Sequence, residues 1–210
     1  MNARAVAALM PLAMLAMITA CSSGTTPIDE GADAQPITGA PQSEETPIVP
    51  VTYIVGTDIQ PGLYRGDAGQ DWFDLCYWTR LRDLSGQPDS IVVTFAPIGQ
   101  FYFEVAETDY AVETTCELEF LPALPQPLAE FPQTIQPGTY LVGIEIQAGT
   151  YQGQAGQDVD QSCYWARCRG LSGWVDAIID NENSTGQFNV QVAPSDVALE
   201  TWCELTRTGP

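Results

Sequence analysis

The basic residues of this 210-residue chain are concentrated in two short matching segments. Arg80 and Arg82 lie in the segment Cys-Tyr-Trp-Thr-Arg-Leu-Arg, and Arg167 and Arg169 lie in Cys-Tyr-Trp-Ala-Arg-Cys-Arg. Side chains two residues apart on a β-strand leave from the same face, so each pair of guanidinium groups is spaced to bind a carboxylate or an anionic sugar. The four arginines are therefore candidate ligand-binding residues.

Each arginine pair follows a tryptophan, Trp78 in the first segment and Trp165 in the second. A tryptophan face beside arginine and carboxylate groups is suited to bind a sugar ring. Burial in the core is the alternative for the tryptophans, and ion pairs with Glu113, Glu117 or their repeat counterparts are the alternative for the arginines. Carbohydrate binding is therefore one hypothesis, and binding of a protein or another partner is the other.

Catalytic chemistry is limited because the chain contains neither histidine nor lysine. Histidine bases, Ser/His/Asp and Cys/His nucleophiles and lysine Schiff bases are excluded. Two carboxylates could still serve as the acid and base of a glycosidase. Five carboxylates recur in both halves of the chain: Asp71, Asp89, Asp109, Glu113 and Glu117, matched by Asp158, Asp176, Asp196, Glu200 and Glu204. Each half of the chain is too short to form a domain with a deep cleft, so we expect no enzyme, with a carboxylate-dependent hydrolase as the alternative.

Metal ligands are similarly sparse. Neither the segment 67–71 nor the segment 180–183 has the spacing of an EF-hand loop. A calcium ion at the loop around Asp180 is an alternative to an ordinary polar turn there. We expect no metal site and no cofactor.

The two segments belong to an internal duplication. Every position from Tyr53 to Glu119 has a counterpart from Tyr140 to Thr206 at a constant offset of 87 residues (140 minus 53), which indicates one folding unit present twice. Both copies contain short runs of β-branched and aromatic residues separated by glycine and proline turns. The sequence predicts an all-β fold of two tandem small antiparallel sandwich or barrel-like domains, at residues 50–119 and 137–210.

The cysteines follow the duplication. Cys76 and Cys116 are separated by 40 residues, as are Cys163 and Cys203. Domains of this size bury little core, and residues 1–21 have the pattern of an export signal, which would bring the chain into an oxidising compartment. We therefore predict one disulfide in each repeat. Buried free thiols are the alternative. Cys168 replaces a leucine of the first repeat, and either burial, an alternative bridge or a disulfide-linked dimer would account for it.

The N-terminus has the three parts of a secretory signal: Arg4, an apolar run from Ala5 to Ala20, and small residues before Cys21. Residues 18–21, Ile-Thr-Ala-Cys, resemble the lipobox of bacterial lipoproteins. That resemblance implies a cleaved signal peptide at residues 1–20 and a lipid-bearing Cys21, with palmitate as the expected acyl group. The protein would then be anchored to the bacterial cell membrane on its extracellular or periplasmic side. A secreted protein without the anchor is the alternative.

Two segments have linker composition. Residues 21–49 contain no aromatic residue and read as a flexible tether. Residues 120–136 contain four prolines and read as a semi-rigid spacer that holds the repeats apart. The chain has 27 acidic and 7 basic residues and a net charge of −20, so nucleic acids and anionic headgroups are poor partners and membrane contact is expected through the anchor alone.

The repeat also resembles an uncharacterised repeat of bacterial secreted and lipid-anchored proteins. The resemblance rests on Gly149-Thr150-Tyr151, on Cys163-Tyr164-Trp165 with Arg167, and on Gly186-Gln187-Phe188 and the segment 196–203 that ends at a cysteine. It implies a β-rich extracellular domain and no activity. We therefore expect a lipid-anchored, non-catalytic envelope protein that displays two domains for binding an unknown protein or glycan.

Overall fold

The computed structural model describes residues 51–70 and 76–210. The predicted signal peptide, the tether and Cys21 lie outside these residues. Fifteen strands and three single-turn 3-10 helices make up the described regular structure, so the predicted all-β fold of two tandem repeats is confirmed. No helix within the described ranges is long and apolar enough to cross a membrane.

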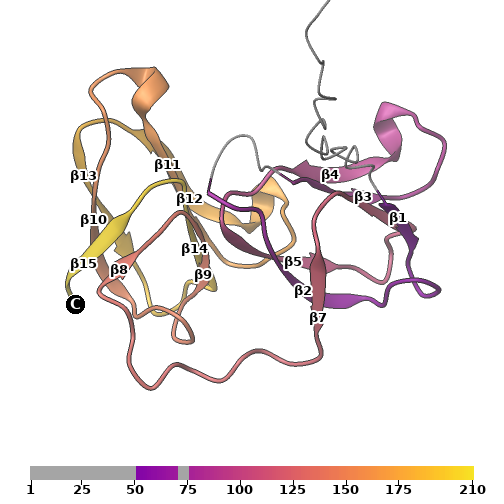
Figure 1. The fold of residues 1–210 in the computed structure, drawn as a ribbon, viewed down its shortest axis with the longest axis horizontal. Coiled ribbons are helices and arrows are strands. Elements are labelled where there is room, and N and C mark those ends of the chain that lie inside the picture. Colours follow the sequence, from indigo (N-terminus) through magenta and orange to yellow (C-terminus); the bar gives the residue numbers. More distant parts are fainter. Residues whose placement is uncertain (1–50, 71–75) are drawn as a thin grey trace, which may run out of the picture. The chain divides into compact units, whose positions relative to one another are not determined.

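The first repeat consists of two antiparallel layers (Figure 1). One layer has the order β1-β6-β3-β4, and the other contains β5, β2 and β7. Their bounds are β1 Val51–Ile54, β2 Gly62–Asp67, β3 Trp78–Leu81, β4 Ile91–Phe95, β5 Gln100–Val105, β6 Ala111–Thr114 and β7 Leu118–Leu121. Trp78 of β3 and Phe103 of β5 stack with ring centroids 4.4 Å apart, and Val112 of β6 is buried beside them. The two layers therefore enclose one apolar core.

The second repeat has the same arrangement. The layer β9-β14-β11-β12 matches β1-β6-β3-β4, and β13-β10-β15 matches β5-β2-β7, with β8 added beside β15. Their bounds are β8 Thr134–Ile135, β9 Gly138–Leu141, β10 Gly149–Gln154, β11 Cys163–Cys168, β12 Ile178–Ser184, β13 Gln187–Val192, β14 Ala198–Thr201 and β15 Leu205–Gly209. Tyr151, Leu199 and Leu205 are fully buried between its layers.

A disulfide supports each repeat. Cys76 is bonded to Cys116 with their Cα atoms 5.0 Å apart, and Cys163 is bonded to Cys203 at 5.7 Å. Both pairings agree with the prediction from the matching separations. A covalent link of this kind stabilises a small domain mainly by restricting its unfolded chain. Cys168 is not disulfide-bonded.

The repeats also contact each other directly. Gln100 of β5 pairs in parallel with Gly138 of β9, which joins strands of both repeats into a seven-stranded sheet of order β12-β11-β14-β9-β5-β2-β7. The Tyr102 hydroxyl donates to Glu145 Oε1 at 2.8 Å, and Tyr102 packs in one apolar cluster with Leu141. The prediction that a spacer holds the repeats apart is therefore wrong, because burial of this shared cluster favours their association.

Candidate functional site

Each segment of predicted site residues places one arginine in an ion pair with an aspartate. Arg80 Nε donates to Asp109 Oδ2 at 2.6 Å and Nη2 donates to Oδ1 at 3.1 Å. Arg167 and Asp196 make the same two bonds at 2.7 and 3.1 Å. The expected partner Glu113 lies opposite Thr79 across the β3–β6 ladder, so its side chain leaves the face opposite to that of Arg80. Asp109 is therefore the correct partner.

The second arginine of each segment lies apart from the first. A register shift occurs after Arg80 in β3 and after Arg167 in β11, and Arg82 and Arg169 follow the ends of those strands. Both of these residues are exposed, whereas Arg80 is buried. The expected pair of guanidinium groups on one face is therefore replaced by one ion-paired arginine and one exposed arginine in each repeat.

Both predicted tryptophans are buried. Trp78 is 2% exposed and Trp165 is 6% exposed. The Trp165 indole donates from Nε1 to Ser184 Oγ at 3.0 Å. The Trp78 Nε1 has no hydrogen-bond partner among the described residues. In the first repeat the position that matches Ser184 is Pro97, which has no hydroxyl to accept this bond. Neither ring presents a face to solvent.

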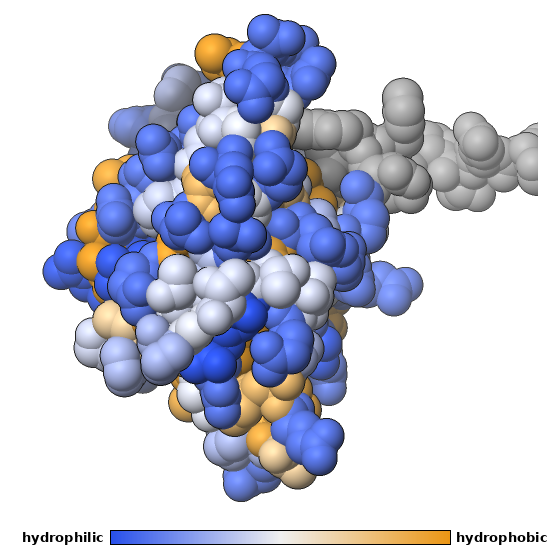
Figure 2. Space-filling model, turned by 90° about the vertical axis from the view of Figure 1, so that its left-hand side faces the viewer, coloured by the Kyte–Doolittle hydropathy of each residue, from blue (hydrophilic) through white to orange (hydrophobic). Residues whose placement is uncertain are grey.

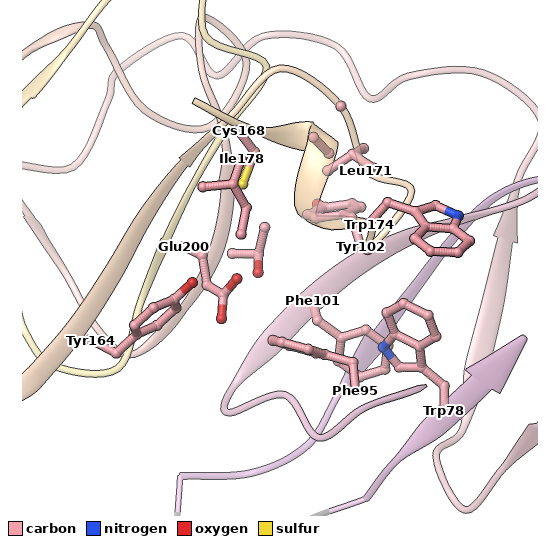
Figure 3. A pocket seen from close by; sticks show the side chains of 14 residues that line it. Trp78, Phe95, Phe101, Tyr102, Tyr164, Cys168, Leu171, Trp174, Ile178 and Glu200 are labelled. Atoms are coloured by element: carbon pink, nitrogen blue, oxygen red, sulfur yellow. The ribbon is translucent and has the colours of Figure 1, made fainter. Parts of the chain in front are cut away.

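A small cavity lies where the two repeats meet, and we call it the inter-repeat cavity (Figure 3). Its volume is about 70 Å³. The first repeat contributes aromatic rings and the second contributes a carboxyl, a thiol and further apolar groups. The main lining side chains are Trp78, Phe95, Phe101, Tyr102, Tyr164, Cys168, Leu171, Trp174, Ile178 and Glu200.

Two titratable groups in the cavity are perturbed by their apolar surroundings. Burial raises the pKa of the Glu200 carboxyl to about 7, although a hydrogen bond from Trp202 Nε1 to Oε1 at 2.9 Å opposes the shift. Burial also raises the pKa of the Cys168 thiol to about 12, and the nearby Glu200 and Asp196 carboxylates add to the increase. Cys168 is therefore protonated at neutral pH and a poor nucleophile.

Comparison with known families identifies the repeated unit. A family model described as the Rv1352-like extracellular domain matches the chain twice, over residues 45–117 and 131–204. The chain belongs to this family. The matches agree with the two repeats of the structure, so the protein carries two tandem Rv1352-like extracellular domains. No curated protein and no solved structure matches the chain.

The inter-repeat cavity at the junction of the two Rv1352-like domains is too small for a typical ligand. Sites for drug-sized molecules usually occupy about 300 to 1,000 Å³, so a volume of about 70 Å³ suits a few water molecules or one small apolar group. Glu200 is the only carboxyl among the described lining residues. No group of three or more potential metal ligands occurs within residues 51–70 and 76–210.

Sequence reasoning missed this cavity because its walls come from both repeats. Trp174 was the available signal, since its counterpart in the first repeat is Gln87. A tryptophan present in only one copy suggests a contact that only one copy makes. The residues of the first repeat that line the cavity with it, such as Tyr102 and Trp78, could not be assigned without knowing that the repeats are docked.

Proposed function

We propose that this protein is a lipid-anchored component of a bacterial cell envelope that displays its two extracellular domains for binding, without catalytic activity. Membership in an extracellular domain family supports exposure outside the cytoplasm, as do two disulfides, which persist in oxidising compartments. The anchor rests on the lipobox-like residues that end at Cys21. The partner would be a protein or a glycan of the envelope or its surroundings.

The observation that carries the binding proposal is a set of apolar side chains on exposed loops. Val159 is 82% exposed, Val175 is 80%, Leu84 is 54% and Trp174 is 42%. These residues lie outside the strands, on connections that a rigid sandwich holds in place, and such connections commonly carry binding function. Figure 2 shows apolar residues as separate patches among hydrophilic ones on one face of the molecule. Small apolar contacts within a polar surface suit selective binding.

The chemistry of the described residues supports a non-catalytic role. The inter-repeat cavity brings one carboxyl, Glu200, together with a thiol that stays protonated. Asp109 and Asp196 are occupied by arginines. A glycosidase needs two carboxyl groups about 5 to 9.5 Å apart on either side of a sugar, and the cavity supplies one. The hydrolase alternative therefore has little structural support.

Carbohydrate binding stays the second candidate, but the tryptophans and two of the arginines expected to bind the sugar are not accessible to it. Trp78 and Trp165 are buried, and Arg80 and Arg167 are ion-paired. Trp174 is the partly exposed tryptophan beside the cavity. A glycan site would have to use this loop and exposed arginines rather than the β3 and β11 strands.

Retention on isolated cell envelopes tests the proposal. The full chain carrying Cys21→Ala, which removes the proposed anchor, should co-sediment saturably with envelopes of the producing bacterium. In the same background, the double variant Val159→Ser/Val175→Ser should bind about fivefold more weakly or worse because it loses two exposed apolar contacts. The variant Asn183→Ser, also at an exposed position, is the matched control. Repeating the assay with purified cell-wall polymer separates a glycan from a protein partner. Equal retention of the double variant and the control would overturn the proposal.

A further inference from the structure

One loop of the second repeat makes part of the contact between the repeats, in addition to the Gln100–Gly138 strand pairing and the Tyr102–Glu145 hydrogen bond. Residues 170–178 contain Leu171-Ser172-Gly173, and we call this segment and its counterpart at residues 83–91 the Leu-Ser-Gly loops. The carbonyl of Leu171 accepts from the Glu104 N–H at 2.9 Å, and the carbonyl of Ser172 accepts from Arg80 Nη1 at 2.7 Å. The second repeat therefore docks onto the outer edge of β5, the same edge that pairs with β9.

The first repeat presents the same loop in the same backbone conformation. Gly86 has φ of 69° and Gly173 has φ of 75°. A single 3-10 turn follows each loop, at Pro88–Ser90 and at Val175–Ala177. The loop of the first repeat is therefore already in the conformation with which the second repeat makes its contact.

No described residue covers the loop of the first repeat. Leu84 is 54% exposed, whereas its counterpart Leu171 is partly buried. A Cβ atom added to Gly86 would meet no atom of the described chain within 4 Å, but one added to Gly173 would approach Trp78 Cη2 at 2.5 Å. The loop at residues 83–91 is thus a docking element without an acceptor among residues 51–70 and 76–210.

The second repeat carries the matching acceptor. Strand β13, the counterpart of β5, lies at the edge of its sheet, and Gln191 occupies the place of Glu104. Arg167, the counterpart of Arg80, uses Nε and Nη2 on Asp196, while its Nη1 donates to no atom of the described residues. Its side chain is 19% exposed, against 5% for Arg80. In the first repeat, Arg80 Nη1 and the Glu104 N–H donate to a Leu-Ser-Gly loop. The matching donors of the second repeat, Arg167 Nη1 and the Gln191 N–H, therefore remain available.

We propose that the protein associates head to tail with a second copy of itself, with the Leu-Ser-Gly loop of the first repeat in one copy docked on the β13 edge of the second repeat in the next. Such a contact joins two different surfaces, so each added copy leaves one free loop and one free edge, and short open arrays result. This inference goes beyond the proposed function. The two share the exposed Leu84, but the association needs only a second copy of the chain and no envelope partner.

The loop at residues 83–91 and the β13 edge are both more polar than the two surfaces that meet within the chain. Gln87 replaces Trp174 on the loop, and Glu182 and Asn189 replace Phe95 and Tyr102 on the acceptor face. A polar loop thus meets a polar face, which gives a more hydrated and weaker contact than the internal one. Anchoring to a membrane would compensate, because it raises the effective concentration of the copies.

Disulfide trapping in living cells tests the association with the full chain. A chain carrying both Leu84→Cys and Gln191→Cys, in a Cys168→Leu background that removes the free thiol, should form a ladder of dimers, trimers and larger species on non-reducing gels. Cells that produce the two single variants together should form dimers, and cells with either one alone should not form the mixed product. The pair Val159→Cys/Gln191→Cys is the control, because Val159 is exposed but lies outside the loop.

A gain-of-association variant adds an independent measurement. Introducing Gln87→Trp and Asn189→Tyr into the trapping chain restores the apolar residues of the internal contact, and it should roughly double the cross-linked fraction or more. Monomers alone in the trapping chain, equal cross-linking of the Val159→Cys control, or an unchanged yield with the restored residues would each overturn head-to-tail association. Retention on envelopes tests the proposed function, and its result does not depend on whether the copies cross-link.

Discussion

Replacing Gly173 with alanine tests the contact between the repeats, because a matched glycine exists in the other copy. Gly173 and Gly86 both have positive φ, 75° and 69°, so an alanine at either position incurs a backbone strain of about 1 to 2 kcal/mol. The Cβ added at Gly173 also lies 2.5 Å from Trp78 Cη2, whereas the one added at Gly86 meets nothing within 4 Å in the described chain.

The steric part of the effect has a predictable size. Trp78 is stacked on Phe103 and has little freedom to move, so the added methyl group overpacks the junction. Overpacking of this kind costs about 1 to 3 kcal/mol. We therefore expect Gly173→Ala to lower the free energy of unfolding by about 2 to 5 kcal/mol and Gly86→Ala by about 1 to 2 kcal/mol.

Urea unfolding of the two variants, followed by circular dichroism and tryptophan fluorescence, measures the difference. Fluorescence is informative because Trp78 and Trp174 both line the junction. The Gly86→Ala variant controls for backbone strain, since it shares the conformation without the contact. Equal destabilisation of the two variants would refute the docking of the Leu171-Ser172-Gly173 loop on Trp78.

Three further perturbations have expected outcomes. Asp109→Ala should cost about 3 to 5 kcal/mol in urea unfolding because it leaves the buried Arg80 charge unpaired, and Asp196→Ala should cost less because its arginine is 19% exposed; equal costs would contradict this reasoning. The pKa of the Glu200 carboxyl is about 7 in the folded protein and about 4.5 in the unfolded chain. Its contribution is therefore fully present below about pH 4.5, and the free energy of unfolding should fall by on the order of 3 kcal/mol as pH rises to about 7. Glu200→Gln should remove that fall, and an unchanged pH profile would rule out Glu200 as its source. Finally, Cys21→Ala should shift the protein from the membrane fraction to the soluble fraction and abolish palmitate labelling, whereas continued membrane retention would exclude the lipid anchor.

Much of the fold follows from features that are local or repeated in the chain. The constant offset between the copies indicates two equal domains, and the matching positions of Cys76, Cys116, Cys163 and Cys203 predict both disulfides. Short β-branched and aromatic runs between glycine and proline turns indicate antiparallel strands. These signals depend on neighbouring residues or on symmetry, so they can be recognised without coordinates.

The site depends on details that spacing does not determine. A register shift after Arg80 separates it from Arg82, and the same shift after Arg167 separates it from Arg169, so an expected pair of neighbouring cations is divided. Asp109 reaches Arg80 from a turn rather than from the neighbouring strand, which strand alternation does not reveal. The inter-repeat cavity requires the docking of two domains. The unmatched Trp174 suggests a contact of the second copy, but the duplication itself does not indicate what Trp174 touches.

The most direct test of the docked arrangement is hydrogen exchange at the Glu104 amide. This N–H points away from the β2–β5 ladder to the carbonyl of Leu171 in the other repeat, at 2.9 Å. If the repeats are docked in solution, the amide should exchange as slowly as its neighbours in β5, and Gly173→Ala should accelerate its exchange selectively. Exchange of Glu104 at the rate of an exposed edge amide in the unmodified protein would contradict the docked arrangement.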